Sequence, residues 1–515
     1  MTGMRLPLAL FAGAALIAGF TALRGIDPFD EGLVLQAARR VSGGQVPYRD
    51  FLWPYGPAQP YLLGLSFELF GTSLLGWRLI RVAVVGLTAL VVFAIVRRAA
   101  GTRVAIVAWL VAACALAQPA NASPFPVALL LGLLALLVAT GGEGSRRRAL
   151  AAGILVGLAA TWRLDFALYA AAGTAAALLA RAGPLRGRLA AVGVMALSAA
   201  GVVLLAYLPF ALATGTSDLY EDLIGRSLEE RDYWTLPFPL DYGGRLRGWP
   251  PGALAEDAKD LLGFYLPLLA TVGLGVAAVA VAQRWRVERR LPPAAAGLLV
   301  FALGPLAYLL SRTDEFHATP LVVTLACLLP AVLASPAAGR AGKLLAAAAA
   351  VVLALLLAYG AANRLSALFL PKPAEAIDVP VADGVRAPPA EARAIERVVA
   401  LVQGRVPPGE PIYVAPARSD LVAFENPLLY VLTERDNATA ADVGLRAPAG
   451  EQRRIVQALE RSRPRVVVRW TDPLSSKREP NPRGRPSGSR IFDDYLERRY
   501  RLVERLYHHD VLERR

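Results

Sequence analysis

The sequence predicts a polytopic α-helical membrane protein of about eleven spans with a small extracytoplasmic α/β domain at its C-terminal end. Three observations support this fold class: 55% of the 515 residues are hydrophobic, the mean hydropathy is +0.44, and the apolar residues form long blocks. A helix needs ~20 apolar residues to cross the ~30 Å hydrocarbon layer. A soluble protein of this length would have a lower apolar fraction.

Eleven apolar blocks read as membrane spans. Nine of them are Leu8–Leu23, Val82–Val96, Val104–Ala117, Pro126–Ala139, Leu189–Ala213, Leu261–Ala282, Ala294–Leu310, Leu321–Leu333 and Leu344–Tyr359. The other two, Ala149–Thr161 and Phe166–Ala180, are short and meet at Trp162-Arg163-Leu164-Asp165. We expect two spans joined by a tight turn there, and a single kinked re-entrant hairpin is the alternative.

The charged residues indicate the orientation. With a cytoplasmic N-terminus, the loops on that side hold 16 basic and two acidic residues, and the opposite loops before the C-terminal domain hold 13 basic and 18 acidic residues. Cytoplasmic loops carry an excess of Lys and Arg. The chain is therefore expected in the plasma (inner) membrane, with its C-terminal domain outside the cytoplasm. The net charge of +14 follows from this topology and does not indicate a nucleic-acid partner.

The first apolar block could also be a cleaved signal peptide, but no clear small-x-small cleavage site follows it. The only two cysteines, Cys114 and Cys327, lie inside apolar blocks. We therefore expect neither a disulfide framework nor a thiolate metal site in the extracytoplasmic parts.

Two long extracytoplasmic loops interrupt the membrane part, at residues 24–78 and 214–260. The first is expected to contain a helix at Glu31–Val41, a break at Ser42-Gly43-Gly44, a second break through the prolines between Pro47 and Pro60, and an apolar segment, Tyr61–Phe70. That segment is too short to span and is expected to lie along the membrane interface. The second loop is rich in acidic and aromatic residues.

We divide the chain into a transmembrane domain (1–362) and a C-terminal domain (363–515). The C-terminal sequence predicts alternating helices and strands, at Glu391–Gln403, Pro411–Ala415, Glu451–Arg461 and Arg465–Trp470. This alternation is typical of a small α/β domain. Its strands are followed by no Gly-rich phosphate loop, and the Pro/Arg/Ser stretch Asp472–Arg490 is expected to be a mobile loop.

Three carboxylates, Asp27, Asp30 and Glu31, follow directly after the first span. One interpretation is helix capping, with Asp30 as the N-cap and Glu31 favoured by the helix dipole. Helix capping accounts well for one acidic residue at this position but poorly for three. The other interpretation is a functional carboxylate at the membrane surface.

The sequence from Asp30 to Pro60 resembles that of a known family. Asp30-Glu31, Gly43-Gly44, Asp50 and Pro54–Pro60 occur in the order found in the GT-C superfamily of polyprenyl-phosphate-sugar-dependent glycosyltransferases. The sequence most resembles the branch that contains aminoarabinose transferases and protein O-mannosyltransferases. The likeness covers the membrane part, with a looser similarity in the C-terminal domain.

Two segments depart from the family pattern. Tyr55-Gly56-Pro57 stands where relatives more usually have a basic residue followed by two prolines. The loop Gln118–Pro124 lacks an acidic residue that some relatives carry.

The resemblance implies an inverting transfer of a sugar from a polyprenyl-phosphate donor to a cell-envelope acceptor, which is a glycan, a lipid or a protein. A carboxylate must take the acceptor's proton, and cations must stabilise the departing phosphate. Asp30 matches the first acid of the family pair and is the expected base, and Glu31 is expected to orient its surroundings. Asp27, Asp50 and Tyr55 are expected to contact substrate. A divalent metal is left open, and no other cofactor is expected.

Further ionisable residues lie between apolar blocks, where charges are costly and usually paired or functional. Arg163 and Asp165 either form a structural pair that fixes the turn, or Arg163 binds the lipid phosphate. Arg312, Asp314 and His317, in the short third loop, are a weaker set of candidates, because a polar loop between spans contains such residues by chance.

The cluster His508-His509-Asp510 has metal-ligand residue types, but nothing near it in the sequence completes a site. We therefore expect a solvated tail.

Two other classes of function are considered. A transporter or lipid flippase would place charges at mid-bilayer and often contain inverted repeats. Here the acids lie in the outer loops and no repeat is visible. A non-catalytic envelope assembly protein of the same fold is the third class, and the Asp30-Glu31 pair favours an enzyme over it.

Overall fold

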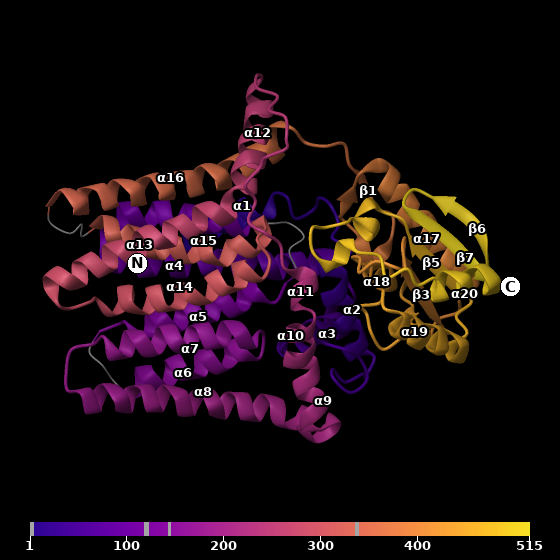
Figure 1. Ribbon diagram of the computed structural model, residues 1–515, viewed down its shortest axis with the longest axis horizontal. Coiled ribbons are helices and arrows are strands. Elements are labelled where there is room, and N and C mark those ends of the chain that lie inside the picture. Colours follow the sequence, from indigo (N-terminus) through magenta and orange to yellow (C-terminus); the bar gives the residue numbers. More distant parts are fainter. Residues whose placement is uncertain (1–4, 118–122, 143–145, 335–338) are drawn as a thin grey trace.

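The computed structural model describes residues 5–117, 123–142, 146–334 and 339–515. Long apolar helices lie side by side in one bundle, and a domain with a β-sheet packs against one end of it (Figure 1). The bundle consists of α1 (Arg5–Gly19), α4 (Leu74–Leu116), α5 (Phe125–Ala139), α6 (Arg146–Ala160), α7 (Leu164–Leu179), α8 (Leu185–Thr214), α13 (Leu266–Glu288), α14 (Pro293–Ser311), α15 (Glu315–Ala334) and α16 (Gly339–Phe369).

Six helices of the described part are long and apolar enough to cross a membrane: α4, α8, α13, α14, α15 and α16. Helices α1, α5 and α7 are apolar but shorter. The backbone of α4 leaves helical geometry at Gly101, where φ is 81°, so its two arms cover two of the expected spans. Helices α6 and α7 are separate and meet in a tight turn, as expected. Helix α13 begins only at Leu266, after the separate helix α12 (Pro251–Phe264), rather than at Leu261.

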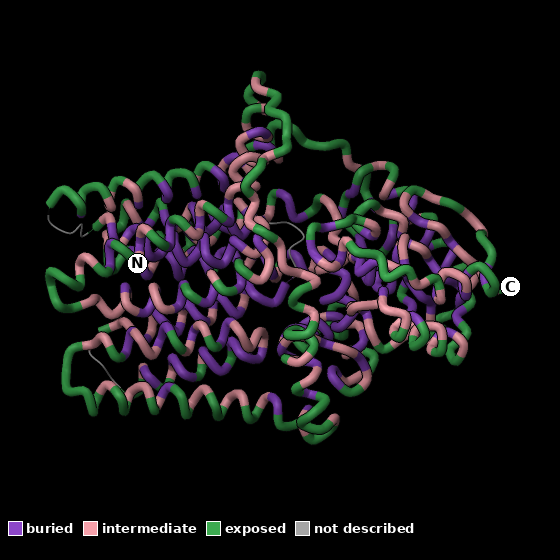
Figure 2. The backbone as a smooth tube through the Cα atoms, viewed as in Figure 1, coloured by how far each residue is buried: buried purple, intermediate pink, exposed green. Residues whose placement is uncertain are grey.

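The interior of the bundle is buried, whereas α8 at its edge is mostly exposed (Figure 2). On α8 the side chains of Leu197, Leu205 and Leu212 are 76%, 77% and 79% exposed. A continuous apolar surface of this kind marks a contact with membrane or with another protein. Together with the length of the helices, it identifies the bundle as membrane-embedded.

The first long loop folds into two short helices, α2 (Asp30–Ser42) and α3 (Ala58–Phe70). The predicted helix and its glycine break are confirmed: α2 ends before Gly43, and Gly44 has a φ of 86° that favours glycine. Helix α2 is largely buried. Helix α3 exposes apolar side chains, with Leu65 52% and Phe70 83% exposed.

The second long loop crosses the end of the bundle beside the sheet domain (Figure 1). It contains α9 (Thr216–Tyr220), a π-helical turn (Glu221–Gly225), α10 (Arg226–Glu229), α11 (Arg231–Trp234) and α12.

The C-terminal domain is built on a five-stranded sheet in the order β4-β3-β5-β7-β6. Strand β3 (Pro411–Pro416) is parallel to β4 (Asp436–Asn437) and to β5 (Val466–Trp470). Strand β7 (His509–Arg514) is antiparallel to β5 and to β6 (Tyr500–Leu506). The helices are α17 (Pro389–Arg405), α18 (Leu428–Thr433), α19 (Ala449–Ser462) and α20 (Ile491–Arg499).

The four elements predicted for this domain are present as α17, β3, α19 and β5. The hairpin β6–β7 was not predicted. Helix α16 continues to Phe369 before the short pair β1 (Glu375–Ala376) and β2 (Arg386–Ala387), so the division expected after residue 362 falls inside this helix.

Two expectations for the C-terminal end are wrong. The stretch Asp472–Arg490 is not a free loop, because it forms two 3₁₀ turns and buries Glu479, Asn481 and Arg483 against the rest of the protein. His508-His509-Asp510 is not a solvated tail. It belongs to the β6–β7 hairpin, where His509 is 2% exposed and hydrogen-bonds through Nδ1 to the carbonyl oxygen of Tyr507.

Candidate functional site

The three carboxylates after α1, those of Asp27, Asp30 and Glu31, make different contacts. Asp27 Oδ1 accepts hydrogen bonds from the backbone N–H groups of Phe29 (3.1 Å) and Asp30 (3.0 Å). Asp27, and not Asp30 as the sequence suggested, therefore satisfies the start of α2. The side chain of Asp30 makes no capping bond and is left free to line a cavity.

Glu31 holds α2 to the bundle. Its carboxylate forms a bidentate ion pair with Arg78 of α4, with Nε–Oε1 and Nη2–Oε2 distances of 2.7 Å, and both side chains are fully buried. Arg78 also donates to the carbonyl oxygens of Ala22 and Gly25. Glu31 does not line the cavity, so its position supports an orienting role.

The cavity has a volume of about 550 Å³ and lies where the end of the bundle, the two long loops and the C-terminal domain meet. Its lining includes Asp30, Tyr55, Arg163, Asp165, Tyr169, Arg226, Glu230, Arg231, Trp234, Tyr308, Ser311, Arg312, Asp314, His317 and Phe424. Six predicted site residues are thus brought together: Asp30, Tyr55, Arg163, Asp165, Asp314 and His317. Asp27 and Glu31 are not among the lining residues.

Burial raises the pKa of Asp30 to about 6. His317, Arg312 and Arg163 oppose this rise, and Asp314 adds to it. Burial also raises the pKa of Asp27, with further repulsion from the two acids that follow it. A carboxyl with a pKa near 6 is suited to taking a proton at neutral pH.

Arg163 is fixed at the turn between α6 and α7. It donates from Nε and Nη2 to the two carboxylate oxygens of Asp165, at 2.9 and 2.7 Å. Its guanidinium lies 5.2 Å from the ring centroid of Tyr55 and 4.9 Å from that of Tyr308. These contacts satisfy the pairing that the sequence suggested, and they also hold the cation in the cavity wall.

Gly56 brings Tyr55 to this turn. Its backbone N–H donates to the carbonyl oxygen of Trp162 at 3.1 Å. A Cβ at Gly56 would lie 2.2 Å from the carbonyl oxygen of Thr161, so only glycine permits this approach.

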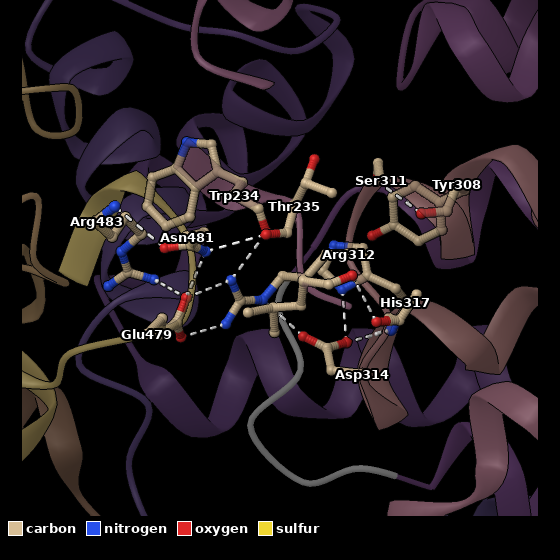
Figure 3. Close-up of polar contacts among 12 residues, drawn as sticks. Trp234, Thr235, Tyr308, Ser311, Arg312, Asp314, His317, Glu479, Asn481 and Arg483 are labelled. Carbon is tan, nitrogen blue, oxygen red and sulfur yellow. Dashed lines mark hydrogen bonds and ion pairs between the residues drawn. The ribbon is translucent and has the colours of Figure 1, made fainter. Parts of the chain in front are cut away.

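A second ion-pair group also lines the cavity (Figure 3). Asp314 Oδ1 is 2.7 Å from His317 Nδ1, and Asp314 Oδ2 accepts from Arg312 Nε at 2.7 Å. Since Asp314 engages Nδ1, the Nε2 edge of the imidazole is the one left to face a ligand. The His317 ring also packs against Tyr308, with centroids 4.7 Å apart.

Asp50 lies apart from this group. It pairs with Arg49 at 2.8 Å and lines a second cavity of about 690 Å³, between the two long loops and the C-terminal domain. The two cavities adjoin, because they share lining residues: Leu52, Arg226, Glu230, Val443 and Gly444.

Within the described ranges, no group of three or more His, Cys, Asp or Glu residues could hold a metal ion. His508 instead pairs with Asp472 at 2.9 Å. Residues 118–122 of the loop Gln118–Pro124 lie outside the described residues.

Several lining residues were not singled out from the sequence. Glu230, Arg231 and Trp234 belong to the acidic and aromatic second loop, which offered a general signal without a specific motif. Phe424 comes from the C-terminal domain, and no motif in the sequence pointed to it as a site residue.

Part of the sequence and the fold are similar to known proteins. The family model described as dolichyl-phosphate-mannose-protein mannosyltransferase matches residues 54–216. The crystal structure of ArnT from Cupriavidus metallidurans bound to undecaprenyl phosphate is similar, with 16% identity, 98% of this chain and 97% of that chain covered, and a TM-score of 0.56. The GT-C resemblance is confirmed.

Two further structures share the GT-C fold. The apo state of the same ArnT has a TM-score of 0.55, with 16% identity over 98% of this chain and 97% of that one. The Archaeoglobus fulgidus oligosaccharyltransferase tethered with an acceptor peptide has a TM-score of 0.53, with 14% identity over 90% of this chain and 69% of that one. No curated protein matches the sequence.

Proposed function

We propose that the protein is an inverting membrane glycosyltransferase that moves a sugar from a polyprenyl-phosphate donor to an extracytoplasmic acceptor of the cell envelope. The observation that carries this proposal is the cavity at the end of an apolar bundle in which Asp30 shares one space with Arg163 and Arg312. The match to a mannosyltransferase family model and the ArnT structure bound to undecaprenyl phosphate support it.

The residues take the following roles. Asp30 accepts the proton of the acceptor hydroxyl as its oxygen attacks the sugar's anomeric carbon and the bond to the phosphate oxygen breaks. Arg163, held by Asp165, stabilises the negative charge of the departing lipid phosphate. Glu31 keeps Asp30 in place through its pair with Arg78.

The donor and acceptor approach from different sides. The exposed apolar face of α3 supports a position in the membrane interface, next to the turn that carries Arg163, where a lipid-linked donor would arrive. The second, more polar cavity adjoins the first on the side of the C-terminal domain. We infer that the acceptor enters through it, past Asp50.

For the topology we propose eleven spans, a cytoplasmic N-terminus and an extracytoplasmic C-terminal domain, on the basis of the charge asymmetry. A reporter that is active only in the cytoplasm, fused after Arg515, should be silent. A bright signal would contradict the orientation or the number of spans.

The activity is tested with purified protein, a panel of polyprenyl-phosphate sugars and a cell-envelope extract as the source of acceptor, with release of free lipid phosphate as the readout. Each reaction is run with and without EDTA, which also decides whether a divalent metal takes part. Release that depends on both the protein and one sugar supports the proposal. Transport of the lipid across vesicles without cleavage of any donor would contradict it.

A further inference from the structure

The C-terminal domain reaches into the wall of the cavity through the segment Glu479–Arg483. This segment lies between β5 and α20, and the side chain of Glu479 is 4% exposed. Asn481 donates from Nδ2 to the carbonyl oxygen of Thr235 at 3.2 Å. The segment therefore docks on the second long loop and on the bundle, and not only on its own domain.

Glu479 binds the outer side of Arg312 (Figure 3). Arg312 Nη2 donates to Oε1 at 2.7 Å and Nη1 donates to Oε2 at 3.0 Å, a bidentate pair. Arg312 Nη1 also donates to the carbonyl oxygen of Trp234 at 3.1 Å, and Nε donates to Asp314. Glu479 itself does not line the cavity, whereas Arg312 and Asp314 do.

A second arginine anchors Glu479 in turn. Arg483 is fully buried and donates from Nη1 to Glu479 Oε2 at 3.2 Å. Its guanidinium lies 4.6 Å from the ring of Trp234 and 4.2 Å from that of Phe424, and both rings line the cavity. The chain of ion pairs thus runs from the C-terminal domain through Glu479 and Arg312 to Asp314 and His317.

We propose that Glu479 is a positioning residue of the donor site, which holds Arg312 and, through it, the Asp314–His317 pair in the wall that receives the lipid phosphate. This inference rests on the proposed function. A guanidinium already fixed by two carboxylates and a carbonyl gives up no rotamer freedom when the donor binds.

A positioning role and a purely electrostatic role of Glu479 predict opposite effects of the substitution Glu479→Gln on phosphate binding. The substitution removes one negative charge beside two arginines, so charge alone would strengthen the binding of a phosphate. Loss of the bidentate pair would release Arg312 and weaken that binding. The sign of the change therefore separates the two effects.

The test measures the affinity of the detergent-solubilised full-length protein for undecaprenyl phosphate, which carries no sugar, by the change in tryptophan fluorescence. We expect Glu479→Gln to weaken binding ~tenfold, a size typical of coupled neighbours. Glu479→Asp, which keeps the charge, should recover most of the loss. Glu504→Gln is the matched control, because Glu504 forms an exposed pair with Arg397 elsewhere in the same domain.

A double-mutant cycle tests whether Glu479 acts through Arg312. In an Arg312→Gln background, Glu479→Gln should cause no further loss. Unchanged or tighter binding in the single variant, or full additivity in the cycle, would overturn the inference. A wild-type protein that does not bind undecaprenyl phosphate would contradict the proposed function itself.

If Glu479→Gln does not fold, as judged by gel filtration, Arg312→Lys tests the same pair from the bundle side. Lysine keeps the charge but cannot form the bidentate contact. The same loss of binding is expected, and normal binding would overturn the inference.

Discussion

Replacing Asp30 by Asn gives the sharpest test of the catalytic assignment. Asparagine keeps the size of the side chain but cannot take up a proton. The capping of α2 should be unaffected, because Asp27 makes those hydrogen bonds. The variant should therefore fold, keep Glu31 paired with Arg78, and still bind undecaprenyl phosphate.

The magnitude follows from the role of a general base. With a pKa of about 6, the carboxyl is roughly nine-tenths ionised at pH 7. Proton transfer by a positioned base contributes ~10²–10⁴-fold to a rate, so turnover of Asp30→Asn should fall by that order. In the wild type, protonation of Asp30 should also make turnover decrease as the pH falls through about 6. The variant should lack this acidic limb.

The assay is release of lipid phosphate from the active donor between pH 5 and 8, with exposed Asp383→Asn as a control that should behave as wild type. Near-normal turnover in Asp30→Asn would refute the assignment, and Asp50, beside the adjoining cavity, would be the next carboxylate to test. An unchanged acidic limb would show that another group carries the proton.

Three further substitutions test the surroundings of the site. Arg163→Ala should weaken undecaprenyl phosphate binding by at least ~tenfold, because it removes a cation from the cavity wall; normal binding with a lower melting temperature would assign Arg163 a purely structural role. Glu31→Gln should destabilise the protein by about 3–5 kcal/mol, because it leaves the buried Arg78 without its counter-charge; an unchanged thermal unfolding profile would contradict this. Gly56→Ala should reduce both stability and turnover, since its Cβ would meet backbone at 2.2 Å, whereas Gly404→Ala, with open space around it, should do neither.

The helical membrane fold with a C-terminal sheet domain could be predicted because long apolar blocks report directly on the membrane and the composition changes after them. Roles within the acidic group could not be derived from the local pattern, because they depend on tertiary contacts. The pattern pointed to Asp30 as the capping residue, whereas Asp27 makes those bonds, and the expected roles of Asp30 and Glu31 came from the family resemblance. Asp30 and Glu31 are neighbours with the same charge, yet one faces the cavity and the other is sealed by Arg78, 47 residues further along the chain. No local pattern distinguishes the two environments.

The segment around Glu479 shows a different limit. Its Pro, Arg and Ser content is typical of a mobile loop, and that composition led to the wrong expectation. The residues that order it are far away in the chain, since Arg312 and Glu479 are 167 positions apart. The buried arginine inside the segment, Arg483, is stabilised by stacking on two aromatic rings that sequence alone does not place.

If the apolar outer face of α3 lies in the membrane interface as proposed, it sets how the proposed reaction should respond to the amount of lipid. This helix follows directly after Gly56, so a donor that stays in the bilayer would reach Arg163 by lateral diffusion along the membrane plane. The frequency of encounters would then depend on moles of donor per mole of surrounding lipid or detergent, and not on moles per litre. Diluting a fixed amount of donor with inert detergent should slow the reaction, whereas a larger aqueous volume at constant acceptor concentration should leave the rate per enzyme unchanged.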